Sequence, residues 1–168
     1  MLPMLPMIRL LCACAAWLAL SAHALEPAKG KVLLTIQGKV GETNSPNAAV
    51  FDLDMLKSLP QQSFSTHTPW DNTPTKFQGP LLRDVLAAAK ASGTTINAVA
   101  LNDYKTTIPF GDAEKFDVIV ALRMNGQAIP VRTKGPLFIV YPYDSKPELS
   151  SKTYYDRSAW QLQRLEIE

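Results

Sequence analysis

The stretch from Ala121 to Pro142 constrains the fold of this 168-residue chain more than any other. It holds two apolar, β-rich runs joined by a long loop that glycine and proline punctuate. The first run ends at the turn dipeptide Asn125-Gly126, and Lys134-Gly135-Pro136 breaks the backbone before the second run, Leu137–Tyr141. Continuous apolar runs bounded by such breakers are typical of strands buried on both faces. The segment therefore predicts two buried strands.

The first 24 residues have the organisation of a secretory signal peptide. Arg9 supplies the positive charge, Leu10–Leu20 is an apolar run, and Ala22-His23-Ala24 fits the small-x-small site after which signal peptidase cuts. The apolar run is about a dozen residues long, short of the ~20 needed to span a bilayer, which favours cleavage over a retained membrane segment. We therefore expect residues 1–24 to be removed on export to the periplasm.

Cleavage after Ala24 leaves residues 25–168, which are enough for one domain with its own core. These carry 16 Lys and Arg against 15 Asp and Glu, with no block of like charges, and this argues against nucleic acid as a partner. Cys12 and Cys14 leave with the leader, and His67 is the remaining histidine. The mature chain therefore has no Cys/His zinc set, no c-type haem motif and no cysteine nucleophile.

Hydrophobic periodicity predicts many strands and few helices. Asp52 is a good N-cap for a short helix that ends at Pro60, and Gly79-Pro80 begins the clearest helix, over 81–91. Loops are expected over 71–78 and 145–151. Strands are expected over 31–40, 48–51, 62–68, 96–101, 104–110, 118–122 and 137–141, and an apolar pattern continues from Trp160 to the C-terminus. The sum is an α+β domain with a mixed, barrel-like β core.

Four segments carry a family resemblance. Phe77–Leu86 reads FQGPLLRDVL, Ala100–Tyr104 reads ALNDY, Leu122–Pro130 contains NGQAIP, and Gly135–Pro142 reads GPLFIVYP. Together with Trp160–Ile167 as a closing segment, their order and spacing resemble the oxidoreductase molybdopterin-binding domain of the sulfite oxidase family, in its small periplasmic branch. The resemblance implies the mixed, barrel-like fold of that family.

Three positions depart from the pattern of catalytic members. The resemblance implies a molybdenum-ligating cysteine shortly before the first segment, but Gln61–Trp70 contains none. It also implies an arginine after Gly-Pro-Leu and a lysine before the closing tryptophan, where this chain has Phe138 and Ala159. A thiolate sets the redox potential of the metal, and a cation helps to hold an anionic cofactor. We therefore expect no cofactor in the usual binding mode.

Two functions stay open. The first is a non-catalytic periplasmic domain that binds a small molecule or a partner protein, in a sensing or accessory role for a membrane signalling protein. The alternative is a molybdopterin-dependent oxidoreductase in which Ser65, Thr66 or His67 replaces the thiolate. A serine hydrolase built from His67 with Ser63 or Ser65 is disfavoured, because the Gly-x-Ser-x-Gly elbow is absent.

Aromatic and polar residues at loop edges are the predicted lining of a binding cleft. For Tyr141 and Trp160 a place in the core is the alternative, and Asn102-Asp103 also fits a turn closed by side-chain-to-backbone bonding. Arg132, in the long loop, could meet an anion or remain solvated. Asp156-Arg157 is expected to pair only locally. The predicted cleft residues are Trp70, Asn102, Asp103, Tyr104, Arg132, Tyr141 and Trp160.

Overall fold

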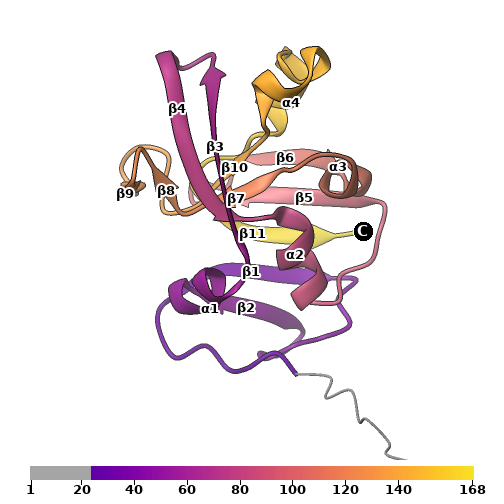
Figure 1. Cartoon of the computed structure of the whole chain (residues 1–168). Coiled ribbons are helices and arrows are strands. Elements are labelled where there is room, and N and C mark those ends of the chain that lie inside the picture. Colours follow the sequence, from indigo (N-terminus) through magenta and orange to yellow (C-terminus); the bar gives the residue numbers. More distant parts are fainter. Residues whose placement is uncertain (1–23) are drawn as a thin grey trace, which may run out of the picture.

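The computed structural model describes residues 24–168, so the predicted signal peptide, 1–24, lies outside the described residues except for Ala24. The described chain is rich in strands and has few helices (Figure 1). Its sheets are mixed and antiparallel, and the predicted α+β class with a mixed, barrel-like β core is confirmed. Within residues 24–168, no helix has both the length and the apolar character needed to cross a membrane.

The largest sheet has five strands, and the last strand in the chain lies at its centre. β11 (Leu162–Ile167) runs parallel to β1 (Val32–Gly38) on one side and antiparallel to β5 (Thr95–Ala100) on the other. The outer strands, β2 (Ala48–Asp52) and β6 (Lys105–Pro109), pair antiparallel with β1 and β5. The sequence predicts β1, β2, β5 and β6 to within two residues at each end.

A long hairpin extends from the body of the molecule (Figure 1). It consists of β3 (Gln61–Thr68) and β4 (Asp71–Pro80), which pair antiparallel along their length. The predicted loop over 71–78 is therefore wrong. Since side chains alternate between the two faces of a strand, only Thr75 and Phe77 of that stretch are buried. The exposed residues Asn72, Thr73, Pro74 and Lys76 surround these two, so the sequence of the strand resembles that of a loop.

Two short strands continue this sheet beyond β4. β8 (Arg123–Met124) and β9 (Gln127–Ala128) form a tight hairpin. Its turn is the predicted Asn125-Gly126 dipeptide, and both residues have positive φ, 50° and 78°. A two-residue turn with two left-handed positions matches the twist of the flanking strands and favours Asn-Gly.

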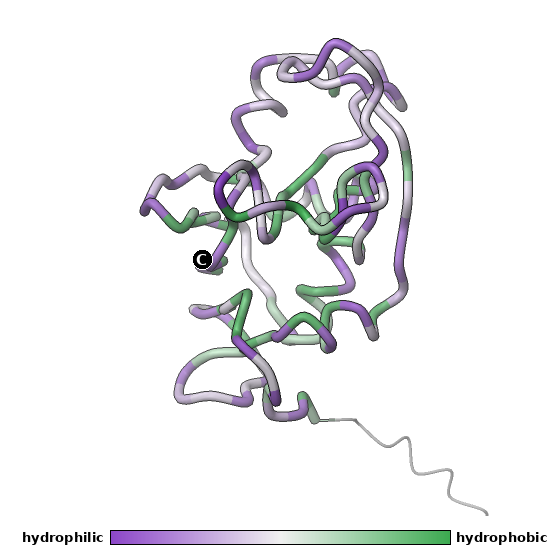
Figure 2. The backbone as a smooth tube through the Cα atoms, turned by 90° about the vertical axis from the view of Figure 1, so that its left-hand side faces the viewer, coloured by the Kyte–Doolittle hydropathy of each residue, from purple (hydrophilic) through white to green (hydrophobic). Residues whose placement is uncertain are grey.

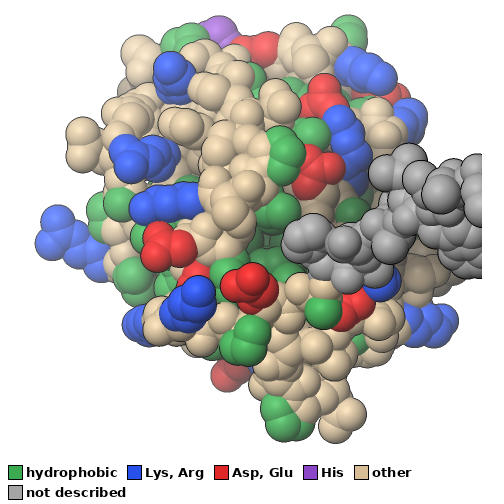
Figure 3. Space-filling view, turned by 60° about the horizontal axis from the view of Figure 1, so that its bottom comes forward, with side chains coloured by type: hydrophobic (Ala, Val, Ile, Leu, Met, Phe, Trp, Pro, Cys, Tyr) green, Lys and Arg blue, Asp and Glu red, His purple; other side chains and the backbone are tan. Residues whose placement is uncertain are grey.

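The two buried strands predicted from the central segment pair with each other. β7 (Ile119–Ala121) and β10 (Phe138–Val140) are antiparallel, and all their side chains are buried. The core around them includes fully buried tyrosines and phenylalanines. Figure 2 shows the hydrophobic segments towards the middle of the fold and the hydrophilic ones along its loops. Acidic and basic side chains are interspersed on the face shown in Figure 3.

Two helices cover the core beside the hairpin. α1 (Leu53–Ser58) begins at the predicted N-cap, since Asp52 Oδ1 accepts the N–H of Met55 at 2.9 Å. α2 (Leu82–Ala88) ends earlier than the predicted 81–91. Lys90 takes the left-handed conformation with φ 46°, and the amides that follow α2 bond back to its last turn. This is a Schellman end without the glycine that usually marks it.

The remaining helical segments are short. α3 (Phe110–Lys115) follows β6, and α4 (Lys152–Arg157) precedes β11. The 3₁₀ turn η1 (Tyr143–Ser145) ends where the predicted loop over 145–151 begins, and that loop contains a second one, η2 (Pro147–Leu149). α4 was not predicted, because six residues are too few to show a helical period.

Leu86 tests the assignment of the buried face of α2. Its side chain is buried in the core, so Leu86→Ala should lower the free energy of unfolding by roughly 2–5 kcal/mol through lost burial and a residual cavity. Urea denaturation measures the change. Leu53→Ala, at an exposed position of α1, is the control and should change stability by less than about 1 kcal/mol. Equal losses in the two variants would contradict the assignment.

Asp52 makes the stability dependent on pH. Its carboxylate accepts the backbone N–H groups of Met55, Gly30 and Lys29, and these bonds hold its pKa below the usual value. A lowered pKa in the folded state stabilises the fold above about pH 4, and this contribution is lost as the pH falls through the folded-state pKa.

Asp52→Asn should therefore be less stable than the wild type at neutral pH, and the difference should shrink in acid. Chemical denaturation at neutral pH and near pH 3 compares the two proteins. Glu114→Gln, which changes an exposed carboxylate of α3, is the control. A difference that stays constant with pH would exclude this role for the charge of Asp52.

Candidate functional site

A cleft of about 290 Å³ opens between the tip of the β3–β4 hairpin, the β5–β6 turn and α4. Two tryptophans and two tyrosines supply most of its apolar lining. An amide, a carboxylate and a hydroxyl supply polar groups. The lining residues are Trp70, Asn102, Tyr104, Tyr155, Asp156, Ser158, Ala159 and Trp160.

Trp70 is the centre of the aromatic cluster at this cleft. It lies in the turn between β3 and β4, where its backbone N–H donates to Thr68 Oγ1 at 3.3 Å. Its ring centroid is 5.5 Å from that of Trp160, 5.8 Å from that of Phe138 and 6.0 Å from that of Tyr155. Tilted and edge-to-face ring pairs stabilise by about 0.5–1.5 kcal/mol each beyond their burial. These contacts attach the hairpin tip to the body and form one wall of the cleft.

Two aromatic side chains of the cleft remain open to solvent. Trp160 is 38% exposed and Tyr104 is 55% exposed. Tyr104 follows the predicted turn, in which Asn102 Oδ1 accepts the N–H of Tyr104 at 3.2 Å and Asp103 has a φ of 62°. Asn and Asp side chains favour such turns because they bond to the nearby backbone and tolerate positive φ. The turn thereby holds the ring of Tyr104 at the edge of the cleft.

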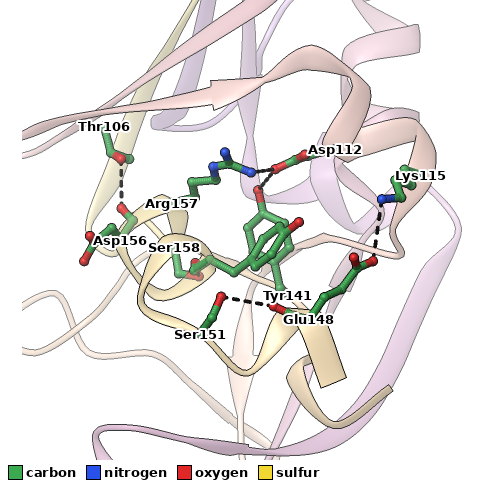
Figure 4. Close-up of polar contacts among 10 residues, drawn as sticks. Thr106, Asp112, Lys115, Tyr141, Glu148, Ser151, Asp156, Arg157 and Ser158 are labelled. Atoms are coloured by element: carbon green, nitrogen blue, oxygen red, sulfur yellow. Dashed lines mark hydrogen bonds and ion pairs between the residues drawn. The ribbon is translucent and has the colours of Figure 1, made fainter. Parts of the chain in front are cut away.

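A charge pair distant in sequence fixes α4, which supplies the opposite wall. Arg157 Nη1 donates to Asp112 Oδ2 at 2.8 Å, and the Tyr141 hydroxyl donates to the same oxygen at 2.7 Å (Figure 4). The prediction that Arg157 pairs locally is wrong, since Asp112 lies 45 residues earlier, in α3. Asp156 does pair locally, with Lys152. The backbone carbonyl of Asp156 also accepts a hydrogen bond from the hydroxyl of Thr106 on β6.

Tyr141 does not line the cleft, and its alternative place in the core is the one that the structure shows. The side chain is fully buried. Burial is the main cause that raises the pKa of Tyr141 far above its usual range, and the neighbouring Asp112 raises it further. The hydroxyl is therefore protonated at neutral pH and donates to Asp112.

The hydroxyl of Ser158 is occupied by structural hydrogen bonds. It donates to the backbone carbonyl of Tyr154 at 2.7 Å and also bonds the hydroxyl of Tyr143. A serine hydroxyl has one proton to donate, and no histidine lines the cleft to accept it. The cleft offers ring faces and hydrogen-bonding groups for binding, without an activated nucleophile.

The structure gathers part of the predicted site. Asp103 belongs to the same turn as Asn102 but does not line the cleft. Arg132 lies in the exposed turn over 131–134, outside the cleft. The four predicted residues that line the cleft are Trp70, Asn102, Tyr104 and Trp160.

Sequence reasoning missed the wall that α4 supplies. Asp156 and Ser158 were not candidates and reach the cleft because α4 is helical and docked, and the same helix places the aromatic ring of Tyr155 there. Ser151 at the N-cap position, and Lys152 and Asp156 at an i,i+4 spacing, were the available signals of a short helix.

The side chains at the cofactor positions implied by the resemblance do not fit a thiolate-ligated, anionic group. Phe138 replaces the arginine and is fully buried, with its ring 5.8 Å from Phe77 and 6.3 Å from Trp160. Ala159 replaces the lysine and is also buried. Neither side chain offers a charge or a donor, so packing contacts stand where an anion would require cations.

Two of the three predicted replacement ligands, Thr66 and His67, are engaged with Asp144, whereas Ser65 is exposed. The backbone N–H of Asp144 donates to Thr66 Oγ1 at 3.0 Å, and His67 Nδ1 lies 2.9 Å from Asp144 Oδ2. Over residues 24–168, no three His, Cys, Asp or Glu side chains gather as a metal-binding group. The donors in this window are hydroxyls and one imidazole, which are harder ligands than a thiolate.

Asp112→Ala tests the attachment of α4. It leaves the mostly buried guanidinium of Arg157 and the hydroxyl of Tyr141 without their acceptor, so the free energy of unfolding should fall by about 3–5 kcal/mol. The control is Lys115→Ala, which breaks the exposed pair with Glu148 and should cost no more than about 1 kcal/mol. Urea denaturation compares them, and similar small losses would show that α4 does not depend on Asp112.

Comparisons with known proteins agree with the resemblance. No curated protein matches the chain significantly. A family model described as the oxidoreductase molybdopterin binding domain matches residues 26–144. This range includes Trp70, Asn102 and Tyr104 but ends before α4 and Trp160, so the family match covers only one side of the cleft. Because the match spans well over half of the sequence, the chain belongs to the oxidoreductase molybdopterin-binding domain family.

Proposed function

We propose that this chain is a non-catalytic binding domain of the molybdopterin-binding oxidoreductase family. Its aromatic cleft takes a small organic molecule, and the domain acts in the periplasm as a sensing or accessory unit for a membrane signalling protein. The observation that carries the proposal is the pairing of an open aromatic cleft with the loss of the usual cofactor-holding side chains.

The ligand chemistry follows from the lining. Ring faces of Trp70, Tyr104 and Trp160 favour flat or apolar groups, and the amide of Asn102 adds hydrogen bonds. Asp156 is the one charged side chain among the lining residues. Asp156 is paired with Lys152, and none of the lining residues is a cation, so an uncharged molecule suits this cleft better than an anionic pterin.

The absence of a suitable donor set supports the non-catalytic part of the proposal. Phe138 and Ala159 are packed into the core, and Thr66 and His67 bond Asp144. To bind a metal, Thr66 and His67 would first have to give up their contacts with Asp144, which hold η1 against β3.

Metal analysis tests the non-catalytic assignment. The mature protein is purified from cells that make the molybdenum cofactor, and its molybdenum content is measured by elemental analysis. We expect far less than one molybdenum per chain in a well-folded protein. A stoichiometric content would overturn the proposal and establish the cofactor-dependent alternative.

Tryptophan fluorescence tests the cleft. Trp70 and Trp160 are the two tryptophans of residues 24–168, and both line it, so a ligand bound there should change the emission. A panel of nucleosides, aromatic amino acids and quaternary ammonium compounds provides the probes. Tyr104→Ala should weaken a responding compound about tenfold or more, while Leu53→Ala, far from the lining, should not. An affinity that Tyr104→Ala leaves unchanged would count against the cleft as the ligand site. So would the absence of a fluorescence response to every compound in the panel.

A further inference from the structure

A second hollow, distinct from the cleft, concentrates exposed aliphatic side chains. It has a volume of about 170 Å³, and we call it the aliphatic hollow. Its apolar lining residues are Val32, Leu33, Leu101, Val131 and Pro136, and Lys31, Thr35 and Gln163 also line it. Val32, Leu101 and Val131 are 42%, 44% and 53% exposed.

The large hydrophobic side chains that the protein exposes are clustered rather than spread evenly over its surface. Residues 24–168 expose six large hydrophobic side chains, and three of them line the aliphatic hollow while Tyr104 and Trp160 line the cleft. Leu53 is the sixth and lies elsewhere, on α1. Single exposed hydrophobics are ordinary, but a contiguous apolar patch on a folded surface marks an interaction site.

Gln161 bonds the backbone of two residues of the aliphatic hollow and directly follows a residue of the cleft. Its carbonyl accepts the N–H of Leu101 at 2.8 Å, and its side-chain Nε2 donates to the carbonyl of Val131 at 2.6 Å. Trp160, the residue before it, lines the cleft. Gln161 has a φ of 49°, a left-handed conformation that few residues with a side chain adopt and that the surrounding hydrogen bonds hold in place.

A cation lines the aliphatic hollow, and a second one lies next to a lining residue in the sequence. Lys31 is its only charged lining residue, and the exposed Arg132 follows Val131 directly. Neither cation takes part in an ion pair within residues 24–168, whereas Lys134, two residues further on, pairs with Asp71. An apolar centre beside unpaired cations is complementary to an apolar segment that carries carboxylates.

We infer that the aliphatic hollow is a docking site for a partner protein, which inserts a short segment with aliphatic side chains flanked by Asp or Glu. The concave shape favours a protein over a bilayer, because a side chain can enter a hollow of this size and a flat lipid surface cannot. Leu101 and Val131 are the central apolar contacts, and Lys31 and Arg132 bind the flanking carboxylates. This site does not require the cleft to hold a ligand.

Peptide selection tests the docking site. The mature protein is used to select from a phage-displayed random peptide library, and a peptide of the consensus sequence is synthesised with a fluorescent label. We expect aliphatic residues next to Asp or Glu in the consensus. Fluorescence anisotropy should show that Leu101→Asp and Val131→Asp each weaken binding at least tenfold, and that added salt weakens it as well.

Leu53→Asp is the matched control, because it places the same charge on an exposed hydrophobic residue that lines neither the aliphatic hollow nor the cleft. It should leave peptide binding unchanged, and thermal denaturation should show that all three variants remain folded. Lys31→Glu should reverse the preference for acidic peptides.

Other occupants give different results. Cosedimentation with phosphatidylglycerol vesicles that Leu101→Asp abolishes would replace the protein partner with a membrane. A dimer in analytical ultracentrifugation that Leu101→Asp dissociates would assign the surface to a second copy of the chain. Failure to enrich any consensus, or a consensus that binds Leu101→Asp as well as the wild type, would also overturn the proposal.

Discussion

The carboxylate of Asp112 is the interaction on which the cleft side of the molecule depends. It accepts hydrogen bonds from Arg157 of α4 and from Tyr141, which follows β10, and it is itself part of α3. Three segments far apart in the sequence thus meet at one oxygen. Because the acceptor is charged and largely buried, each donor matters more than a surface contact would. The position of α4, and with it half of the cleft, follows from this junction.

Aromatic packing gives the same region its rigidity. Trp70 reaches from the hairpin tip to Phe138 and Trp160, so the projecting β3–β4 ribbon is attached at both ends. Phe138 stands at the position for which the resemblance implies an arginine, and its ring packs against Trp70 and Trp160. This position therefore contributes aromatic packing to the cluster and offers no charge.

The sequence predicts the strands and helices in which the hydrophobic pattern is uniform along the whole element. β7 and β10 are continuous apolar runs, and both were predicted. β4 was missed because Asn72, Pro74 and Lys76 on its exposed face resemble a loop. The end of α2 was misplaced because Lys90, rather than a glycine, takes the left-handed position. In the site, the turn at Asn102 has a local signal and was predicted. The partner of Arg157 was not, since a contact over 45 residues depends on the folded topology and leaves no local pattern.

The position of β11 determines when the domain can become native. β1 and β5 make no hydrogen bonds to each other and are joined only through this final strand. Gln37 and Glu166, paired across β1 and β11, are 129 residues apart, so the ribosome must finish nearly the whole chain before the sheet can close. Long-range strand pairing of this kind is slow. Until β11 is in place, β1 and β5 each keep one strand edge unpaired and open to other extended chains.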